Sequence, residues 1–361
     1  MSTDTTPPDT ISLEAAKKLV DKTLEDFFAT RIEKADTMHA AYTDLWKTAS
    51  TLSRSGGKRL RPYVALLTYE SVSGKPASDI ISVASSLELL HLGMLVHDDI
   101  IDRDSIRYGV LNISGSYNET YKEFIPDARE RQHFSDSAAL MAGDLLLLGG
   151  HDLILEGRLS DGQLRIASNI YNDAAFVVAG GELLDTEASF RPPEAIDATT
   201  VGRLKTAHYS FITPLLMGAC LGGASEKTCQ QLQEFGENLG IGYQLVDDLL
   251  GVFGAESVTR KSTMNDLREG KKTFLVEQFE LLATSEQRGT FEQLFGKKTL
   301  SHSEADILRD LLIESGAKKS VETSITMYKN KALQILERLV MDSAHRLAFE
   351  KLVLQALDRV F

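Results

Sequence analysis

The stretch Leu87–Asp102, LELLHLGMLVHDDIID, indicates the fold class most directly. Its apolar residues Leu87, Leu90, Met94 and Leu95 recur at steps of three and four residues, which is the period of an α-helix and not the alternation of a strand. The ten residues that precede His97 are mostly apolar, so we expect this helix to be largely buried and to end in carboxylates.

The rest of the chain also favours helices. Proline, which breaks helix interiors, occurs only at positions 7, 8, 62, 76, 126, 192, 193 and 214. Apolar residues at helical spacing return in Leu232, Phe235, Leu239, Tyr243 and Val246. We find no convincing hairpin signal and no repeat of fixed period. The sequence therefore predicts an all-α protein.

The predicted organisation is simple. We expect residues 1–10 to be a disordered tail and residues 11–361 to form a single all-helical domain. Within that domain, Gly56-Gly57 and the stretch from about 112 to 135 are expected to be loops.

Composition limits the possible partners and compartments. The formal net charge of −13 argues against nucleic acid and anionic membranes as partners. The two cysteines, Cys220 and Cys229, give neither a disulfide framework nor a zinc spacing. The N-terminus does not have the pattern of a signal peptide, and the longest weakly polar run, Leu215–Ala224, is too short to span a membrane. We therefore expect a cytoplasmic protein without a transmembrane segment.

The first acidic cluster consists of Asp98, Asp99 and Asp102. On a helix, Asp98 and Asp102 lie one turn apart on the same face, with Asp99 beside them. Carboxylates this close repel one another unless a cation holds them, and hard oxygen ligands suit Mg²⁺. A solvated acidic helix face is the alternative, but the apolar residues before the cluster disfavour it.

A second cluster, Gln244–Asp248, also follows an apolar helical stretch and contains Asp247 and Asp248. One Asp-Asp pair is weak evidence, but two clusters that each end a buried helix are less readily incidental. They predict facing helices whose carboxylates converge on metal ions.

Basic residues gather in Gly56–Pro62, GGKRLRP. Glycines permit close backbone approach, and Lys and Arg bind phosphate oxygens. The spacing is not that of a P-loop, and a basic helix start on the surface is the alternative. Lys205-Thr206, Lys261 and Lys271-Lys272 add positive groups to an otherwise acidic chain.

The ordered set of motifs resembles the trans-type polyprenyl diphosphate synthases, from about Ser55 to about Thr273. The resembling segments are Gly56–Pro62, Asp98–Asp102, Ala142–Asp144, Leu184-Asp185, Lys205-Thr206, Gln244–Asp248, Lys261 and Asp266–Lys271. The resemblance implies an isoprenoid-synthase-type helical bundle around a central cavity, usually in a homodimer. It also implies condensation of isopentenyl diphosphate with allylic diphosphates.

The resemblance assigns roles residue by residue. The carboxylates implied to hold Mg²⁺, about three ions in each active site, are Asp98, Asp99, Asp102, Asp247 and Asp248. The residues implied to act in ionisation and carbocation stabilisation are Asp98, Asp102, Lys205, Thr206, Gln244, Asp247 and Lys261. The residues implied to bind the substrate diphosphates are Lys58, Arg61, His91, Arg107 and Lys271. The released pyrophosphate is the expected proton acceptor, so no protein nucleophile is required.

The chain departs from the family pattern in several places. Tyr108 replaces a second arginine that normally helps to bind isopentenyl diphosphate, and we hypothesise that Arg103 or Arg59 compensates. Gly251 replaces the third aspartate of the second motif, Glu182 stands where the family often has Gln, and the loop after residue 109 is longer than usual.

The residues before Asp98 bear on product length. The positions four and five residues before it, where the family's short-chain synthases carry bulky aromatics, are Met94 and Gly93. We therefore expect a product of about twenty carbons or more, since flexible Met can yield space.

Three other functions stay open at this point. A non-catalytic or regulatory subunit of a heteromeric synthase would explain Tyr108 and Gly251, although the retained carboxylates and lysines argue against it. A terpene cyclase of the same fold would leave Lys58, Arg61 and His91 unexplained. A helical scaffold with acidic surface patches would not bind diphosphates in a metal-dependent way.

Overall fold

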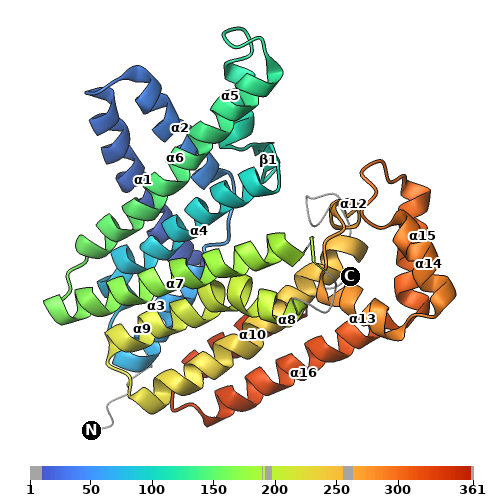
Figure 1. Ribbon diagram of the computed structural model, residues 1–361. Helices are drawn as coiled ribbons and strands as arrows, with labels where there is room; N and C mark the ends of the chain where they lie inside the picture. Colours follow the sequence, from blue (N-terminus) through green and yellow to red (C-terminus); the bar gives the residue numbers. More distant parts are fainter. Residues whose placement is uncertain (1–9, 189, 192–196, 255–262, 359–361) are drawn as a thin grey trace. The chain divides into compact units, whose positions relative to one another are not determined.

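Helices make up almost all of the regular structure. The computed structural model describes residues 10–188, 190–191, 197–254 and 263–358 (Figure 1). Within these residues the strands are a single antiparallel pair, β1 (Ile106–Arg107) and β2 (Val110–Leu111). The all-α prediction is confirmed. The predicted tail, apart from Thr10, lies outside the described residues.

The chain forms two compact units, each of which we describe by itself. The first unit comprises Met1–Asp173 and Pro214–Ser225, and the second comprises Ala174–Thr213 and Glu226–Phe361. That residues 11–361 form a single domain stays a prediction.

Helices of the first unit carry the first acidic cluster and the basic loop. They are α1 (Leu13–Asp36), α2 (Ala40–Ser55), α3 (Leu60–Ser73), η1 (Ala77–Ile80), α4 (Ile81–Ile101), α5 (Ile113–Thr120), α6 (Ala128–Leu155), the first part of α7 (Asp161–Ala188) and most of α9 (Thr213–Gly222).

Helices of the second unit carry the second acidic cluster. They are the end of α7, α8 (Ala198–Val201), the π-helix η3 (Gly202–Ile212), α10 (Glu226–Phe253), α12 (Asn265–Glu269), α13 (Phe274–Leu282), α14 (Ser285–Leu294), α15 (His302–Glu314), α16 (Ala317–Arg338) and α17 (Ser343–Leu357).

Helix α4 lies in the core of the first unit, as its apolar period predicts. Leu87, Leu89 and Leu90 are at most 1% exposed, and each buried leucine contributes about 1.5–3 kcal/mol. Helix α6 packs along α4 (Figure 1). The two helices approach closely at Gly143. A Cβ at that position would lie 2.2 Å from the His97 ring, so only glycine admits that ring. The packing fixes α4 immediately before its carboxylates.

The expectation that residues 112–135 form a loop is wrong. Helix α5 begins after Asn112, whose side chain accepts a hydrogen bond from the Gly115 amide at 2.8 Å. Helix α6 begins after Asp127, whose carboxylate accepts from two amides of the first turn. Both are N-cap signals that outweigh the polar, glycine-containing composition.

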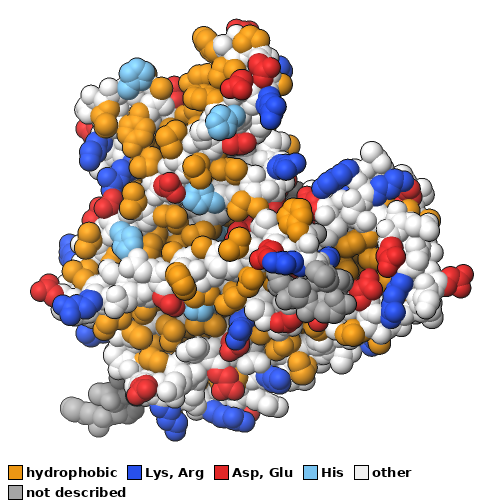
Figure 2. Space-filling model, in the orientation of Figure 1, with side chains coloured by type: hydrophobic (Ala, Val, Ile, Leu, Met, Phe, Trp, Pro, Cys, Tyr) orange, Lys and Arg blue, Asp and Glu red, His pale blue; other side chains and the backbone are white. Residues whose placement is uncertain are grey.

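Two segments are long and apolar enough to cross a membrane by length and composition, Ala77–Ile101 and Ala128–Leu155. The expectation that Leu215–Ala224 is the longest weakly polar run is therefore wrong. In the most apolar stretch of each segment, 67% and 50% of the residues are buried inside the protein. The core helices of soluble proteins can be equally long and apolar. The two segments are thus weak evidence for a membrane span. Hydrophobic side chains also reach the surface around α6 (Figure 2).

Candidate active site

In the first unit, Arg107 joins two carboxylates of the first acidic cluster. Its Nε donates to Asp99 Oδ1 at 2.7 Å, and its Nη2 donates to Asp98 Oδ2 at 3.0 Å and to Asp99. Asp102 caps the C-terminus of α4. Because Arg107 and Asp99 are both buried, the guanidinium offsets the repulsion between the two carboxylates within the protein itself.

Burial shapes the electrostatics of this pair. Loss of solvent raises the pKa of Asp99 to about 6, although the Arg107 charge opposes that rise. Burial also disfavours the charged form of Arg107, but the Asp99 and Asp98 carboxylates outweigh it and raise the pKa of the guanidinium. Arg107 therefore stays charged.

The predicted magnesium site is only partly supported by geometry. Carboxylate oxygens are the ligands that Mg²⁺ prefers, and Asp99 Oδ2 is buried without a hydrogen-bond partner. However, across the described part of the chain no three His, Cys, Asp or Glu side chains are close enough together to hold a metal ion. The donor chemistry fits the metal, but these side chains alone do not form a finished cage. Mg²⁺ commonly completes its shell with water and substrate phosphates.

The basic loop lies immediately before α3 in the same unit. Lys58 is exposed and Arg61 is half-buried. Arg59 is buried, and its three nitrogens donate to Asp21, to Glu88 and to a backbone carbonyl. The hypothesis that Arg59 compensates for the missing second arginine is therefore wrong, because its guanidinium is committed to the protein.

Tyr108, the residue at the place of that arginine, lies against the basic loop. A Cβ at Gly56 would be only 2.5 Å from the Tyr108 ring, so the ring covers the glycine. Burial, followed by the Glu88 charge, raises the pKa of the phenol, and the nearby charge of Arg61 opposes this. Tyr108 supplies a neutral hydrogen-bonding group here in place of a cation.

His91 belongs to the same neighbourhood. Burial and then the charges of Arg61, Arg107 and Arg59 hold the pKa of its ring well below the usual range. The ring is therefore neutral at pH 7 and can donate one hydrogen bond and accept another. The first unit thus brings together His91, Arg61, Arg107 and the carboxylates of Asp98 and Asp99.

In the second unit, Lys205 and Thr206 lie on the π-helix η3. Such helices are rare and are frequent at functional sites. A Cβ at Gly181 would lie 2.4 Å from the Lys205 backbone nitrogen, so the close approach of α7 and η3 requires glycine. Lys205 Nζ contacts Asp185 Oδ2 at 2.7 Å and Glu182 Oε2 at 2.9 Å.

A hydrogen-bonded chain runs from η3 to the second acidic cluster. The Thr206 hydroxyl donates to Gln244 Oε1, and Gln244 Nε2 donates to Asp248 Oδ1 at 2.7 Å. Burial raises the pKa of Asp248 to about 7, while Gln244 opposes that rise. Asp247 precedes it on α10 and is half-buried. These two hydrogen bonds fix the orientation of the Gln244 amide.

Several of these groups line a small pocket of the second unit. Its volume is about 50 Å³, and its lining includes Asp185, Lys205, Gln244, Asp248 and Lys271. Lys271 Nζ lies 3.7 Å from Asp185 Oδ2. The sequence-predicted residues that line this pocket are Lys205, Gln244, Asp248 and Lys271. Thr206 joins them through its hydrogen bond to Gln244, and Asp247 precedes Asp248 on α10. Lys261 lies outside the described residues. Convergence of the two acidic clusters on shared metal ions stays a prediction, because each unit is described by itself.

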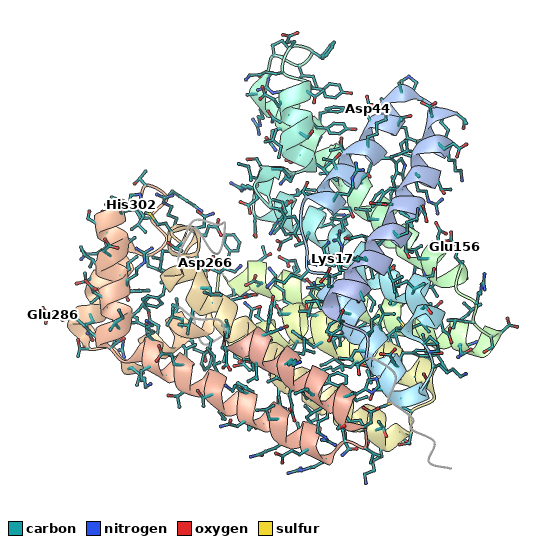
Figure 3. The ribbon with its side chains drawn as sticks, turned by 180° about the vertical axis from the view of Figure 1, so that it is seen from behind. Lys17, Asp44, Glu156, Asp266, Glu286 and His302 are labelled. Carbon is teal, nitrogen blue, oxygen red and sulfur yellow. The ribbon has the colours of Figure 1, made fainter. Side chains whose placement is uncertain are left out.

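Sequence reasoning missed the significance of Asp266, which is labelled in Figure 3. A Cβ at Gly251 would lie 2.1 Å from Asp266 Oδ2, so a carboxylate from α12 occupies the space beside that glycine. An aspartate at position 251 would bring a second carboxylate against that of Asp266. Asp266 is visible in the sequence as the first residue of the segment Asp266–Lys271, but the sequence does not show that its carboxylate lies beside Gly251.

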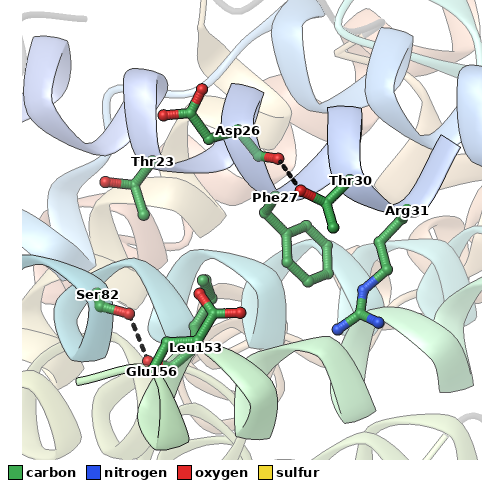
Figure 4. Close-up of a pocket in the computed structure, with 8 residues that line it drawn as sticks. All are labelled: Thr23, Asp26, Phe27, Thr30, Arg31, Ser82, Leu153 and Glu156. Carbon is green, nitrogen blue, oxygen red and sulfur yellow. Dashed lines mark hydrogen bonds between the residues drawn. The ribbon is translucent and has the colours of Figure 1, made fainter. Parts of the chain in front are cut away.

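A pocket of about 310 Å³ lies elsewhere in the first unit (Figure 4). Its lining residues are Thr23, Asp26, Phe27, Thr30, Arg31, Ser82, Leu153 and Glu156, and none of them is a predicted site residue. The Arg31 guanidinium lies 5.1 Å from the Phe27 ring centre and is also paired with Asp152. The pocket therefore does not belong to the candidate active site.

Comparison with known proteins gives consistent matches. Residues 43–312 match the family model described as polyprenyl synthetase. The chain is 33% identical to a geranylfarnesyl diphosphate synthase of Aeropyrum pernix, over 80% of this chain and 85% of the relative. It is 29% identical to a geranylgeranyl diphosphate synthase of Sulfolobus acidocaldarius, over 79% and 82%. Among solved structures, the chain is similar to a geranylgeranyl pyrophosphate synthase of Corynebacterium glutamicum in complex with isoprenyl diphosphate and magnesium. The two superpose with a TM-score of 0.90 at 27% identity, over 97% of this chain and 100% of that one.

Proposed function

Because the chain belongs to the polyprenyl synthetase family, we propose that it condenses isopentenyl diphosphate with allylic diphosphates to elongate trans-prenyl chains. The chain is an enzyme of the prenyltransferase class. The observation that carries the proposed reaction is the neighbourhood of His91, where cationic groups lie beside buried carboxylates. A reaction between two diphosphates requires both kinds of group.

The carboxylates would bind the allylic substrate through metal. Asp98, Asp102 and Asp247 would hold Mg²⁺, with Asp99 and Asp248 beside them, and bound metal would stabilise the charge on the leaving diphosphate. Arg107 already donates hydrogen bonds to Asp98 and Asp99, and its remaining N–H groups would donate to phosphate oxygens. Lys205 and Lys271, both beside Asp185, would contact the same leaving group.

Thr206 and Gln244 would stabilise the allylic carbocation. Since the Thr206 hydroxyl donates to Gln244, a lone pair of its oxygen is left for a positive centre. Both dipoles are fixed before the reaction, which is the arrangement that lowers the reorganisation cost of a developing charge. Lys58, Arg61 and the neutral His91 would bind isopentenyl diphosphate, and the released pyrophosphate would accept the proton.

We propose a product of about twenty carbons or more, in agreement with the named activities of the relatives. Position 94 carries flexible Met and no aromatic ring. Gly93, however, provides no open space, because a Cβ there would lie 2.9 Å from the Leu147 side chain of α6. Helix α6 therefore supplies part of the wall beside Gly93, which the sequence of α4 alone does not reveal.

A homodimer is proposed on the basis of an apolar stripe along α6. Four apolar side chains of α6 are each more than half exposed and recur at helical spacing, namely Leu140, Met141, Leu148 and Leu155. A second copy of the chain in the cytoplasm would cover them. A Leu148→Asp variant should shift the mass measured by light scattering from dimer to monomer, and an unchanged mass would reject this face.

The test is elongation by purified protein with labelled isopentenyl diphosphate and Mg²⁺, in which dimethylallyl, geranyl and farnesyl diphosphates are offered separately. Asp98→Ala should abolish the product, whereas the exposed carboxylate control Asp161→Ala should not. Product length is read by chromatography.

Other outcomes point to the alternatives. Ionisation of the allylic substrate without elongation would support a terpene cyclase. No turnover from folded protein would support a subunit that needs a partner. The scaffold alternative predicts no metal-dependent binding of any diphosphate.

A further inference from the structure

Arg59 lies in the middle of the basic loop, yet it is withdrawn from the surface. The side chain is 6% exposed. Its Nε donates to Asp21 Oδ1 at 2.7 Å, Nη1 to Glu88 Oε1 at 2.8 Å and Nη2 to the Ser53 carbonyl at 2.6 Å. The guanidinium therefore ties the loop to α1, to α4 and to the end of α2.

The backbone of the loop is held in an unfavourable conformation. Among the described residues, the non-glycine residues with positive φ are Arg59 (54°), Arg103 (58°) and Tyr108 (55°). All three lie in the basic loop or in the segment 103–109 that follows the first acidic cluster. Side chains disfavour this region, and such strain persists only where the surroundings impose it, typically at functional sites.

The two strained segments touch one another. The Tyr108 ring covers Gly56 at one end of the basic loop. At Gly57, whose φ is +96°, a Cβ would lie 2.8 Å from Arg59 Nη1 and 3.4 Å from Glu88 Oε1. The backbone thus turns tightly around the Arg59–Glu88 pair, and this turn separates exposed Lys58 from half-buried Arg61.

We propose that Arg59 is a positioning residue for the second diphosphate: through Asp21 and Glu88 it fixes the turn that presents Lys58 and Arg61, without itself touching substrate. The inference rests on the proposed function, because it takes isopentenyl diphosphate as the ligand of those two cations. Glu88 and Asp21 then affect binding of the same substrate indirectly, because they hold Arg59.

Steady-state kinetics of Arg59→Lys, Glu88→Gln and Asp21→Asn test the inference. We expect KM for isopentenyl diphosphate to rise about tenfold in each, while kcat and KM for the allylic diphosphate change by less than about twofold. The anchor variants should reproduce the effect of Arg59→Lys because the position of the loop, and not the Arg59 charge, is what matters.

Lys17→Gln is the matched control. Lys17, labelled in Figure 3, pairs with Asp21 at 2.6 Å, and its side chain is 43% exposed. Its constants should match those of the wild type. A proportional fall of kcat with both KM values unchanged would reduce Arg59 to a purely structural role. A KM effect confined to Arg59→Lys would indicate direct contact with substrate. Either result overturns the proposal.

Calorimetric binding of isopentenyl diphosphate separates this inference from the proposed function. If the wild type binds this ligand without turnover and Glu88→Gln binds it about tenfold more weakly, the proposed reaction fails and the positioning role stands. If Glu88→Gln or Asp21→Asn, whichever folds with a wild-type melting curve, binds as tightly as the wild type, the positioning role is wrong. If the wild type does not bind this ligand, both are wrong.

Discussion

The two acidic clusters have the same Asp-Asp sequence but balance their buried charge differently. In the first unit, Arg107 neutralises Asp98 and Asp99 through charge-assisted hydrogen bonds. In the second unit, Asp248 accepts a hydrogen bond from the neutral amide of Gln244. Burial accordingly raises the pKa of Asp99 to about 6 and that of Asp248 to about 7.

A shared motif therefore does not mean a shared electrostatic state. A carboxylate held by an arginine depends on that arginine for its charge. A buried carboxylate held by an amide destabilises the folded protein and is relieved when a cation or a ligand arrives. Variants that remove one compensating group at a time can therefore distinguish the two clusters.

Replacement of Arg107 should have the largest effect. Arg107→Met leaves Asp99, which is 3% exposed, as an uncompensated buried charge. We expect the free energy of unfolding to fall by about 3–5 kcal/mol and elongation to be lost. Urea denaturation without ligands measures the first effect. Arg165→Ala, at an exposed position of α7, is the control and should change stability by less than about 0.5 kcal/mol. Equal losses in the two variants would contradict the role of Arg107.

The second cluster should respond in the opposite sense. Asp248→Asn removes a buried charge and can keep the hydrogen bond from Gln244. We expect the free energy of unfolding at pH 8 to rise by about 1–3 kcal/mol, while elongation falls. Differential scanning calorimetry beside activity assays tests this. A destabilised Asp248→Asn protein would show that the charge is already compensated in the folded state.

Much of this could be read from the sequence, because the evidence lay in local patterns. The helical period of α4 and the carboxylates at its end predicted a buried helix with an acidic terminus. The contacts of Arg59 with Asp21 and Glu88, and of Tyr108 with Gly56, could not be read, because they join residues 29 to 52 positions apart through side-chain geometry. The α5 and α6 starts were missed because their caps, Asn112 and Asp127, look like ordinary loop residues.

His91 offers a pH-dependent comparison within the first unit. The pKa of its ring is held below the usual value by burial and then by Arg61, Arg107 and Arg59. Below about pH 6.5 the unfolded chain binds a proton that the folded protein does not, so this residue makes the protein lose stability as the pH falls. We expect the loss to approach about 1.4 kcal/mol per pH unit. His91→Gln should remove that part of the dependence in urea denaturation at pH 7.5 and 5.5. Parallel curves for wild type and variant would contradict a ring that stays neutral in the folded protein.

Gly251→Ala should have the smallest effect on stability and makes the sharpest test of the second cluster. The added methyl group meets only the end of the Asp266 side chain, which can rotate away, so we expect a change of less than about 1 kcal/mol. Elongation should nevertheless fall, because Asp266 stands beside Asp248 and contributes to the raised pKa of that carboxyl.

Gly289→Ala, where a Cβ meets no neighbouring atom, is the control in calorimetry and in the elongation assay. If Gly251→Ala keeps full activity, the Asp266 carboxylate does not act as the replacement for the missing aspartate. If activity falls while stability holds, an aspartate on α12 takes the role that the family motif places on α10.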